Sequence, residues 1–352
     1  MKRIKLYPLL LLVSILMFIN CNYLIASALP KIVVISTGGT IAMKLDEKTK
    51  EAVPALTGKD LVEAVPQIKD LADIEVVEFS NIDSSYMSPD HWIRLAKLVN
   101  ETLQRDDVVG VVITHGTDTM EETAYFLDLT VDSRKPVVLT GAQRTATDKD
   151  SDGPRNILNA TRIILSKAPF DRGVMICMNN YINAARPVRK TNTNNVQTFE
   201  SGEYGYLGYV DDDRVIYYNK PLRRFKLPLP NKLAKVDVLT MFTGSDGKYI
   251  RYAADNGIDG LVVVAFGRGN VNKEVYEAME YAIKKGVYVV IATRVYYGSV
   301  KPVYGVLGGG GSLEKLGAIF ADDLTPAKAR ILLMLALGQT NNREEIQNLY
   351  YK

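Results

Sequence analysis

The sequence predicts an α/β protein of two domains, each built on a mainly parallel β-sheet with flanking helices. Two observations support this prediction. Apolar runs of strand length alternate with segments of helical periodicity along the chain. Several of the apolar runs also end abruptly at glycine or hydroxyl-bearing residues, as strands do where they pass into a loop and then a helix.

In chain order, we expect strands to begin near Lys31, Ile74, Val108, Pro136, Gly173, Val236, Ile258, Val287 and Gly317. We expect helices over 88–103, 120–129, 153–166, 272–285 and 325–337. The last helix has clear limits, because Thr325 can cap it, Pro326 suits its first turn and Gly338 follows its end. The alternation predicts layers like those of Rossmann and flavodoxin-like folds.

The alternation breaks once, between the two expected domains. An extended linker over 221–235 is indicated by Pro221, Pro228 and Pro230 together with Arg223, Arg224 and Lys226. We therefore expect a larger N-terminal catalytic domain over 29–220 and a smaller C-terminal domain over 236–352. Two other irregular stretches stand out. The charged segment 44–57 suits a mobile lid, and the glycine-rich segment 307–312 is expected to be a flexible loop.

The first 28 residues have the pattern of a secretory signal peptide. A basic start precedes an apolar run over 9–19, and a small-residue cleavage site ends at Ala28. The run is short for a membrane span, so we expect cleavage near Ala28, a periplasmic or secreted product and no stable membrane anchor. An uncleaved anchor, or a lipoprotein attached through Cys21, are the alternatives.

Composition excludes several classes of function for the mature chain. The leader holds three of the 43 basic residues and no acidic one, which leaves 40 basic against 40 acidic residues. A near-neutral chain without a basic stripe argues against binding of nucleic acid. Only Cys177 remains after cleavage, so no disulfide can form within the chain. With two histidines in all, His91 and His115, no metal site is expected.

Two strand ends carry residues suited to catalysis. The first expected strand runs into Thr-Gly-Gly-Thr, which ends at Thr40, and the third runs into His115-Gly-Thr117-Asp118. Ligands of open α/β sheets bind at the carboxyl ends of the strands. Thr40 is the best candidate for a nucleophile, although a threonine hydroxyl needs a base beside it. The alternatives are that Thr40 and Asp118 only cap helices, and that His115 is structural rather than catalytic.

Two further segments complete the candidate site. Lys190 follows an irregular stretch, and a lysine near a carboxylate can act as a base toward a hydroxyl. From spacing alone, a solvated surface lysine is the stronger interpretation. Ser84 and Ser85 follow an acidic residue at the end of the second strand. They suit a small zwitterionic ligand, and they equally suit capping of the helix expected over 88–103.

Taken together, these segments resemble the bacterial L-asparaginase family, and in particular its exported type II enzymes. Four motifs carry the resemblance in family order: Thr-Gly-Gly-Thr-Ile-Ala over 37–42, His-Gly-Thr-Asp-Thr-Met-Glu-Glu-Thr-Ala over 115–124, Gly-Ala-Gln-Arg over 141–144 with Ser-Asp-Gly-Pro over 151–154, and Lys-Thr-Asn-Thr over 190–193. The resemblance covers essentially the whole mature chain.

The resemblance implies hydrolysis of L-asparagine to L-aspartate and ammonia without a cofactor. Thr40 would form an acyl-enzyme, and Thr117, Asp118 and Lys190 would form a second catalytic group. The substrate would also contact Ser84, Ser85 and Ala142. The family further implies a homotetramer built as a dimer of dimers, in which Asn270 reaches the site of a partner subunit.

The chain departs from the family pattern in three places. Enzymes of this family usually carry a catalytic tyrosine in the lid. Here that tyrosine is absent, and Glu51 lies near the aligned position. Tyr86, outside the lid, is the candidate substitute. Ser85 replaces a glutamine, from which we expect weak activity on L-glutamine. The glutamate that a partner chain usually contributes to the site in this family has no clear match.

Three other functions compete with an asparaginase. The first is a broader glutaminase-asparaginase, and the second is a non-catalytic exported amino-acid-binding relative. The third is a transfer-RNA-dependent amidotransferase subunit, against which the leader argues.

Overall fold

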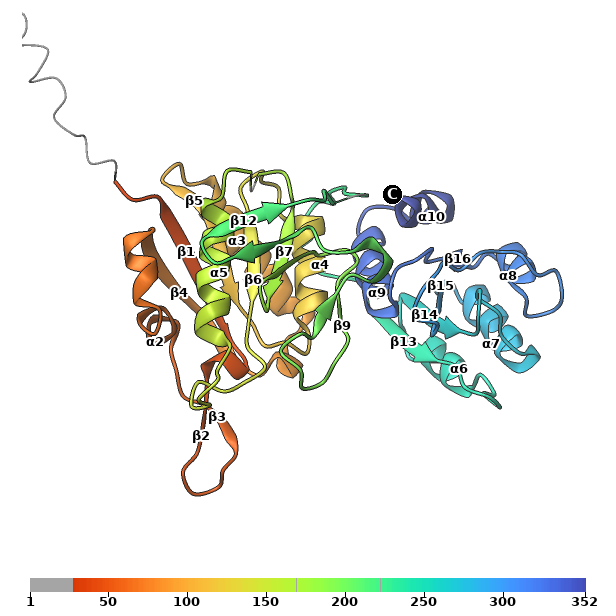
Figure 1. Cartoon of the computed structure of the whole chain (residues 1–352). Coiled ribbons are helices and arrows are strands. Elements are labelled where there is room, and N and C mark those ends of the chain that lie inside the picture. Colours follow the sequence, from red (N-terminus) through yellow and green to blue (C-terminus); the bar gives the residue numbers. More distant parts are fainter. Residues whose placement is uncertain (1–27, 169, 222) are drawn as a thin grey trace, which may run out of the picture.

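The computed structural model describes residues 28–168, 170–221 and 223–352, which form two α/β units side by side (Figure 1). The larger unit is built on an eight-stranded sheet of order β12-β11-β8-β7-β6-β5-β1-β4. The smaller unit has a four-stranded sheet of order β13-β14-β15-β16. The predicted fold class, two domains with mainly parallel sheets and flanking helices, is confirmed.

The larger sheet is parallel over its central part and antiparallel at one end. All pairs from β4 to β7 are parallel, and the pairs from β7 through β8 and β11 to β12 are antiparallel. Its strands are β1 (Lys31–Gly38), β4 (Asp73–Ile82), β5 (Val108–Thr114), β6 (Val137–Thr140), β7 (Val174–Met178), β8 (Tyr181–Ala184), β11 (Gly208–Asp211) and β12 (Arg214–Tyr217).

Helices cover both faces of this sheet. Side chains of β1 alternate between the faces, so Ile32 and Val34 pack with α2 (Gly58–Glu63) and α5 (Gly153–Leu165). Val33 and Ile35 point the other way, into the core that includes α3 (Pro89–Gln104) and α4 (Met120–Thr130). A strand buried on both faces reads as a continuous apolar run, which is why β1 was predictable.

The smaller sheet is entirely parallel. Its strands are β13 (Val236–Thr240), β14 (Gly260–Ala265), β15 (Tyr288–Thr293) and β16 (Ile319–Phe320). Right-handed crossovers place α6 (Lys248–Asp255), α7 (Lys273–Lys284) and α8 (Gly310–Leu316) on one face. The chain then crosses to the other face as α9 (Pro326–Ala336), followed by α10 (Arg343–Tyr351). Helix α9 also contacts α4, so one apolar core continues through both units (Figure 1).

Short elements complete the fold. The 3-10 helices are η1 (Thr40–Ala42), η2 (Pro66–Asp70), η3 (Ser84–Tyr86) and η4 (Gly202–Tyr204). Strands β9 (Arg189–Lys190) and β10 (Phe199–Glu200) pair with each other outside the main sheets. No helix of the described residues is long and apolar enough to cross a membrane. The predicted signal peptide falls on residues 1–27, outside the described part of the chain, and on Ala28.

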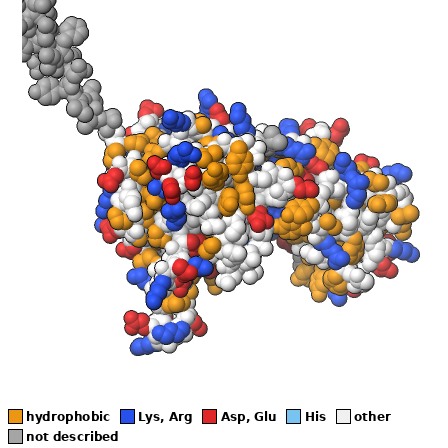
Figure 2. Space-filling view, viewed as in Figure 1, with side chains coloured by type: hydrophobic (Ala, Val, Ile, Leu, Met, Phe, Trp, Pro, Cys, Tyr) orange, Lys and Arg blue, Asp and Glu red, His pale blue; other side chains and the backbone are white. Residues whose placement is uncertain are grey.

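The two irregular stretches are more ordered than expected. Segment 44–57 contains the hairpin of β2 (Met43–Leu45) and β3 (Ala52–Pro54), which projects from the larger unit with charged side chains over its tip (Figures 1 and 2). The prediction of a flexible loop over 307–312 is wrong in its second half, since α8 begins at Gly310. A Cβ on Gly308 would lie 2.2 Å from the carbonyl oxygen of Val271, so this glycine serves close packing.

Candidate active site

The topology of the larger sheet places a crevice at the carboxyl end of β1. Strand β1 lies between β4 and β5, so the chain leaves it toward one neighbour and later returns on the other side. Such a switch point is where open α/β sheets bind ligands. Thr40 follows β1, Ser84 follows β4 and Thr117 follows β5, so all three candidate residues stand at this crevice.

Two glycines bring these segments into direct contact. Gly39 has φ of 85°, and a Cβ there would lie 2.2 Å from the Cα of Gly116. A Cβ on Gly116 would lie 2.6 Å from the Oγ of Ser84. Side chains at these two positions would push the strands apart, so glycine is required. Thr40 and Thr117 each follow one of the touching glycines and therefore lie on adjacent segments.

Lys190 contacts both Thr117 and Asp118. Its Nζ donates a hydrogen bond to Thr117 Oγ1 at 2.8 Å and another to Asp118 Oδ1 at 2.7 Å. The Lys190 side chain is only 18% exposed, and its backbone N–H donates to Glu121 Oε2 at 2.5 Å. Lys190 is thus directed inward from β9, and the interpretation as a solvated surface lysine fails.

Sequence reasoning missed one partner of Thr117. The Thr117 hydroxyl stands 3.4 Å from Gln143 Oε1, to which it donates. Gln143 follows buried Ala142, and its backbone N–H is held by Asp152 at 3.1 Å. An amide just after the end of β6 was the available signal, since that strand end neighbours the end of β5.

Thr40 begins η1 and does not cap a helix, because Gly39 occupies the capping position. Its side chain is half-buried. No hydrogen bond among the described residues involves the Thr40 hydroxyl. Tyr86, the proposed substitute for the lid tyrosine, is 74% exposed, and no hydrogen bond of the described residues joins it to Thr40. Among the described residues, none is hydrogen-bonded to the Thr40 hydroxyl as a base.

The ligand-binding candidates divide between the crevice and the surface. Ser84 is buried at the crevice, and its carbonyl accepts a hydrogen bond from the Thr119 hydroxyl at 2.8 Å. Ser85 is exposed, with its backbone N–H bound to Asp83 Oδ1 at 2.8 Å. Thr119, and not Asp118, holds the position before α4, so Asp118 is free to bind Lys190.

His115 is a structural residue. It is fully buried, and burial lowers its pKa from 6.5 to about 4, so the ring is neutral at physiological pH. His115 Nδ1 lies 2.7 Å from the Gly116 carbonyl, which can only accept, so Nδ1 carries the proton and donates. The unprotonated Nε2 of the neutral ring then accepts from the Thr123 hydroxyl at 3.0 Å, and Thr123 Oγ1 in turn accepts from Trp92 Nε1 at 3.0 Å. His115 thereby fixes the loop that holds Thr117.

Asn270 lies in the smaller unit, after β14, and the structure does not bring it to the crevice of its own chain. Its backbone N–H donates to the Phe266 carbonyl at 2.9 Å, and Phe266 returns the bond. Its side-chain Oδ1 is buried without a hydrogen-bond partner among the described residues. A role at the site thus requires a second subunit.

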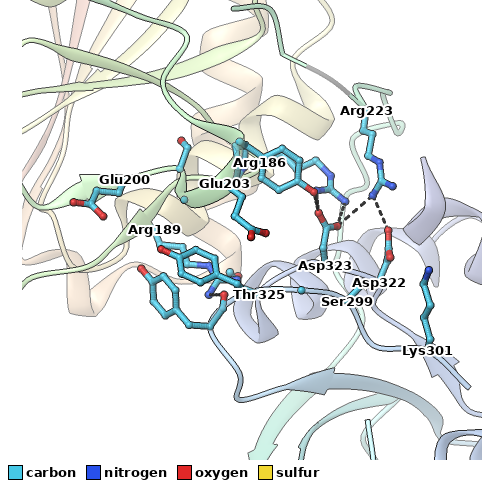
Figure 3. Close-up of a pocket in the computed structure, with 17 residues that line it drawn as sticks. Arg186, Arg189, Glu200, Glu203, Arg223, Ser299, Lys301, Asp322, Asp323 and Thr325 are labelled. Atoms are coloured by element: carbon cyan, nitrogen blue, oxygen red, sulfur yellow. Dashed lines mark hydrogen bonds and ion pairs between the residues drawn. The ribbon is translucent and has the colours of Figure 1, made fainter. Parts of the chain in front are cut away.

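A separate cavity of about 290 Å³ lies where the two units meet (Figure 3). It is lined by charged and tyrosine side chains, including those of Arg186, Arg189, Glu203, Tyr296 and Asp323. None of the predicted catalytic residues lines it. Within the described residues, no three histidine, cysteine or acidic side chains are arranged to hold a metal ion.

Comparisons with known proteins agree with this geometry. Residues 31–223 match the family model "Asparaginase, N-terminal", and residues 235–350 match "Glutaminase/Asparaginase C-terminal domain". L-asparaginase 2 of Escherichia coli is 40% identical over 333 residues, covering 92% of this chain and 94% of the relative. The probable periplasmic L-asparaginase of Haemophilus influenzae is also 40% identical, with 92% and 93% covered.

A solved structure extends the similarity to three dimensions. The crystal structure of a probable cytoplasmic L-asparaginase from Campylobacter jejuni superposes with a TM-score of 0.85 at 42% identity, covering 92% of this chain and 99% of that one. Fold and crevice together define an α/β amidohydrolase. The chain belongs to the asparaginase family and is an asparaginase. An enzyme is thereby favoured over a non-catalytic amino-acid-binding relative.

Proposed function

We propose that this enzyme hydrolyses L-asparagine to L-aspartate and ammonia through an acyl-enzyme on Thr40. One observation carries the proposal: Lys190 binds both Thr117 and Asp118 at the crevice beside Thr40. This arrangement joins a hydroxyl, an amine and a carboxylate, which are the groups needed to move a proton. The names of the matched relatives support the substrate.

The reaction proceeds in two steps. Thr40 Oγ1 attacks the side-chain amide carbon, and ammonia leaves with the hydroxyl proton, which gives an ester on Thr40. Water activated through Thr117 and Lys190 then attacks the ester and releases L-aspartate. Backbone N–H groups near Thr40 and Thr117 stabilise the oxyanion in each step. The chemistry needs no cofactor.

The remaining residues bind the substrate. Asp118 is 63% exposed, so one of its oxygens can bind the substrate ammonium while the other holds Lys190. Ser84 binds the α-carboxylate, with Ser85 beside it, and Ala142 lines the crevice. Asn270 of a partner subunit completes the site in a homotetramer.

Substitution of the two reacting groups tests this function. Thr40→Ala and Lys190→Met are each expected to lower ammonia release by at least about a hundredfold, because each removes a group that takes part in bond making or proton transfer. The matched controls are Thr340→Ala and Lys97→Met on the surface, which should retain wild-type rates. Substantial turnover in Thr40→Ala or Lys190→Met removes that residue from its role.

A broader glutaminase-asparaginase is the second candidate, since the C-terminal family model names both activities. Ser85 favours asparagine, because its short hydroxyl reaches a ligand amine less readily than a long amide does. We expect kcat/KM for L-asparagine to exceed that for L-glutamine by at least about tenfold. Equal values for the two amides reject the preference.

We further propose that the enzyme is exported. The sequence of the leader supports this, as does the periplasmic relative from Haemophilus influenzae, whereas the Campylobacter jejuni neighbour carries a cytoplasmic title. The mature N-terminus of the native protein, read by mass spectrometry, is expected just after Ala28. An N-terminus that retains the leader contradicts export by cleavage.

A further inference from the structure

The segment that carries Lys190 is held by the smaller unit. Residues 185–188 connect β8 to β9 in the larger unit, and their backbone is bound by Lys328 of α9 in the smaller unit. We use the term interdomain clamp for Arg186, Asp323 and Lys328, the residues that join the two (Figure 3 shows the first two). None of these three residues contacts Thr40 or Thr117 directly.

Lys328 is the inner part of the clamp. It is 0% exposed, and its Nζ donates hydrogen bonds to the carbonyl oxygen of Arg186 at 2.9 Å and to that of Val188. A lysine is almost never fully buried without partners. No salt bridge to Lys328 exists within the described residues, so its direct hydrogen bonds go to these carbonyls, and the centroid of the Tyr125 ring lies 6.0 Å from Nζ.

The charges around Lys328 are mixed. Burial lowers its pKa from 10.5 to about 8, so the amine is still mainly protonated at neutral pH. That value of the pKa already includes the surrounding charges: the guanidinium groups of Arg189 and Arg186 act in the same direction as burial, while the carboxylates of Glu121 and Glu122 raise the pKa. A buried ammonium whose main bonds go to two backbone carbonyls is costly to retain for packing alone, which indicates a role in fixing that backbone.

Arg186 and Asp323 form the outer part of the clamp. The Arg186 guanidinium binds the Asp323 carboxylate through two hydrogen bonds, of 2.7 and 3.2 Å. The two side chains are 8% and 13% exposed, and the Tyr204 hydroxyl also donates to Asp323. A two-point contact of this kind fixes orientation as well as position. The same residue, Arg186, is therefore held by its side chain and by its carbonyl.

We propose that the interdomain clamp is a positioning device that holds Lys190 against Thr117 and Asp118. Val188, whose carbonyl binds Lys328, precedes Lys190 by two residues, and the Lys190 backbone is fixed again by Glu121. Lys190 reaches the crevice from a two-residue strand, which cannot hold its own position. The proposal depends on the function proposed above for Lys190. It makes the smaller unit part of the catalytic apparatus of its own chain.

Two substitutions in the clamp test this proposal. Lys328→Met removes the donors and keeps the length of the side chain, and Asp323→Asn weakens the outer contact near the surface. Tyr350→Phe is the matched control, because its buried hydroxyl also donates to a backbone carbonyl of α9, that of Ala329 at 2.8 Å, inside the smaller unit. Steady-state kcat and KM for L-asparagine and the thermal midpoint are measured for each full-length enzyme.

We expect Lys328→Met and Asp323→Asn to lower kcat at least about tenfold with KM changed less than about threefold, because a displaced Lys190 impairs chemistry more than binding. Tyr350→Phe should lose stability yet keep kcat within about twofold. If Lys328→Met does not fold, Asp323→Asn decides alone. Retention of wild-type kcat in the folded clamp variants, or an equal loss in Tyr350→Phe, overturns the proposal.

The same assay separates this proposal from the function itself. Wild-type enzyme without ammonia release, or Lys190→Met as active as wild type, contradicts the proposed role of Lys190. A different outcome contradicts only the positioning by the clamp. In that outcome the wild type is active, Lys190→Met is inactive, and the clamp variants keep the wild-type kcat.

Discussion

At the scale of single residues, His115 couples the active-site loop to pH. Its neutral ring accepts from Thr123 and donates to the Gly116 carbonyl, beside Thr117. The pKa of the ring is about 4 in the folded protein and 6.5 in an exposed histidine. Between these values the unfolded chain binds more protons than the folded one, so stability falls as the pH falls from about 6.5 toward 4.

We therefore predict acid-dependent stability from this residue. The shift corresponds to about 3 kcal/mol of unfolding free energy, present above pH 6.5 and lost by about pH 4. Urea unfolding at intervals from pH 7 to pH 4, in wild type and in His115→Gln, measures it. The glutamine variant is expected to be less stable at pH 7 and to show a shallower acid slope. Parallel pH dependences in the two proteins contradict the assignment.

Residue chemistry was more predictable from sequence than residue contacts. Thr117, Asp118 and Lys190 were candidates because of their types and their places at strand ends. Their contact was not predictable from spacing, because 73 positions separate Lys190 from Thr117 and an exposed lysine fits the same pattern. Gln143 and Lys328 had no sequence signal of comparable strength, since their roles depend on the partners that folding brings to them.

At the scale of elements, the β2–β3 hairpin is the least supported part of the larger unit. Its base is tied down by backbone hydrogen bonds from Ala55 and Leu56 to Ala42, and Leu45 binds the Thr147 hydroxyl at 3.1 Å. The tip over 46–51 makes hydrogen bonds only within the hairpin. A two-stranded hairpin with three residues in each strand is marginally stable alone.

We predict that this tip is the first site of proteolysis. Brief trypsin treatment should cut after Lys48 or Lys50, both exposed, before any other described lysine or arginine, because the tip can open without disturbing the core. Saturating L-aspartate should slow the cut several-fold if the hairpin closes over the crevice. Peptide mass mapping identifies the site, with Lys48→Gln/Lys50→Gln as control. Unchanged cleavage with L-aspartate contradicts a lid.

Most of the expected strands begin where the sequence places them. The starts of β1, β4, β5, β6, β7, β13 and β15 lie within one residue of the expected positions, because apolar runs of strand length mark them. The starts of β14 and β16 were placed two residues early. Strands β8, β11 and β12 were missed. They are four-residue antiparallel strands at the edge of the sheet, where partly exposed side chains and short length give no clear periodicity. Helix α8 was missed because glycines at its start resemble a loop.

At the scale of the whole molecule, one segment of the smaller unit exposes several large apolar side chains. Seven large apolar side chains between positions 295 and 307 are exposed by 42% to 71%: Val295, Tyr296, Tyr297, Val303, Tyr304, Val306 and Leu307. Tyr296 and Tyr297 line the cavity between the two units, whereas Val303, Tyr304, Val306 and Leu307 offer an apolar segment of the kind found at association surfaces. The exposed segment supports the proposed homotetramer.

Mixing inactive subunits tests whether Asn270 acts across an interface. Thr40→Ala and Asn270→Ala homo-oligomers are each expected to be inactive. In a mixed pair, one site receives both defects, while the other combines an intact Thr40 from one chain with an intact Asn270 from its partner. Random association in an equal mixture then restores about one quarter of the wild-type sites, and removal of the homo-oligomers raises this share to between about one quarter and one half.

The two variants are co-expressed with different affinity tags, and complexes that hold both are purified through both tags. Ammonia release is then measured for these complexes. Light scattering gives the mass of the assembly. Doubly tagged complexes as inactive as their parents contradict a contribution from the partner subunit. A monomeric mass for active enzyme contradicts it independently. Val306→Glu, placed in the exposed apolar segment, is expected to weaken assembly and activity together, because an unpaired charge in a desolvated interface opposes association.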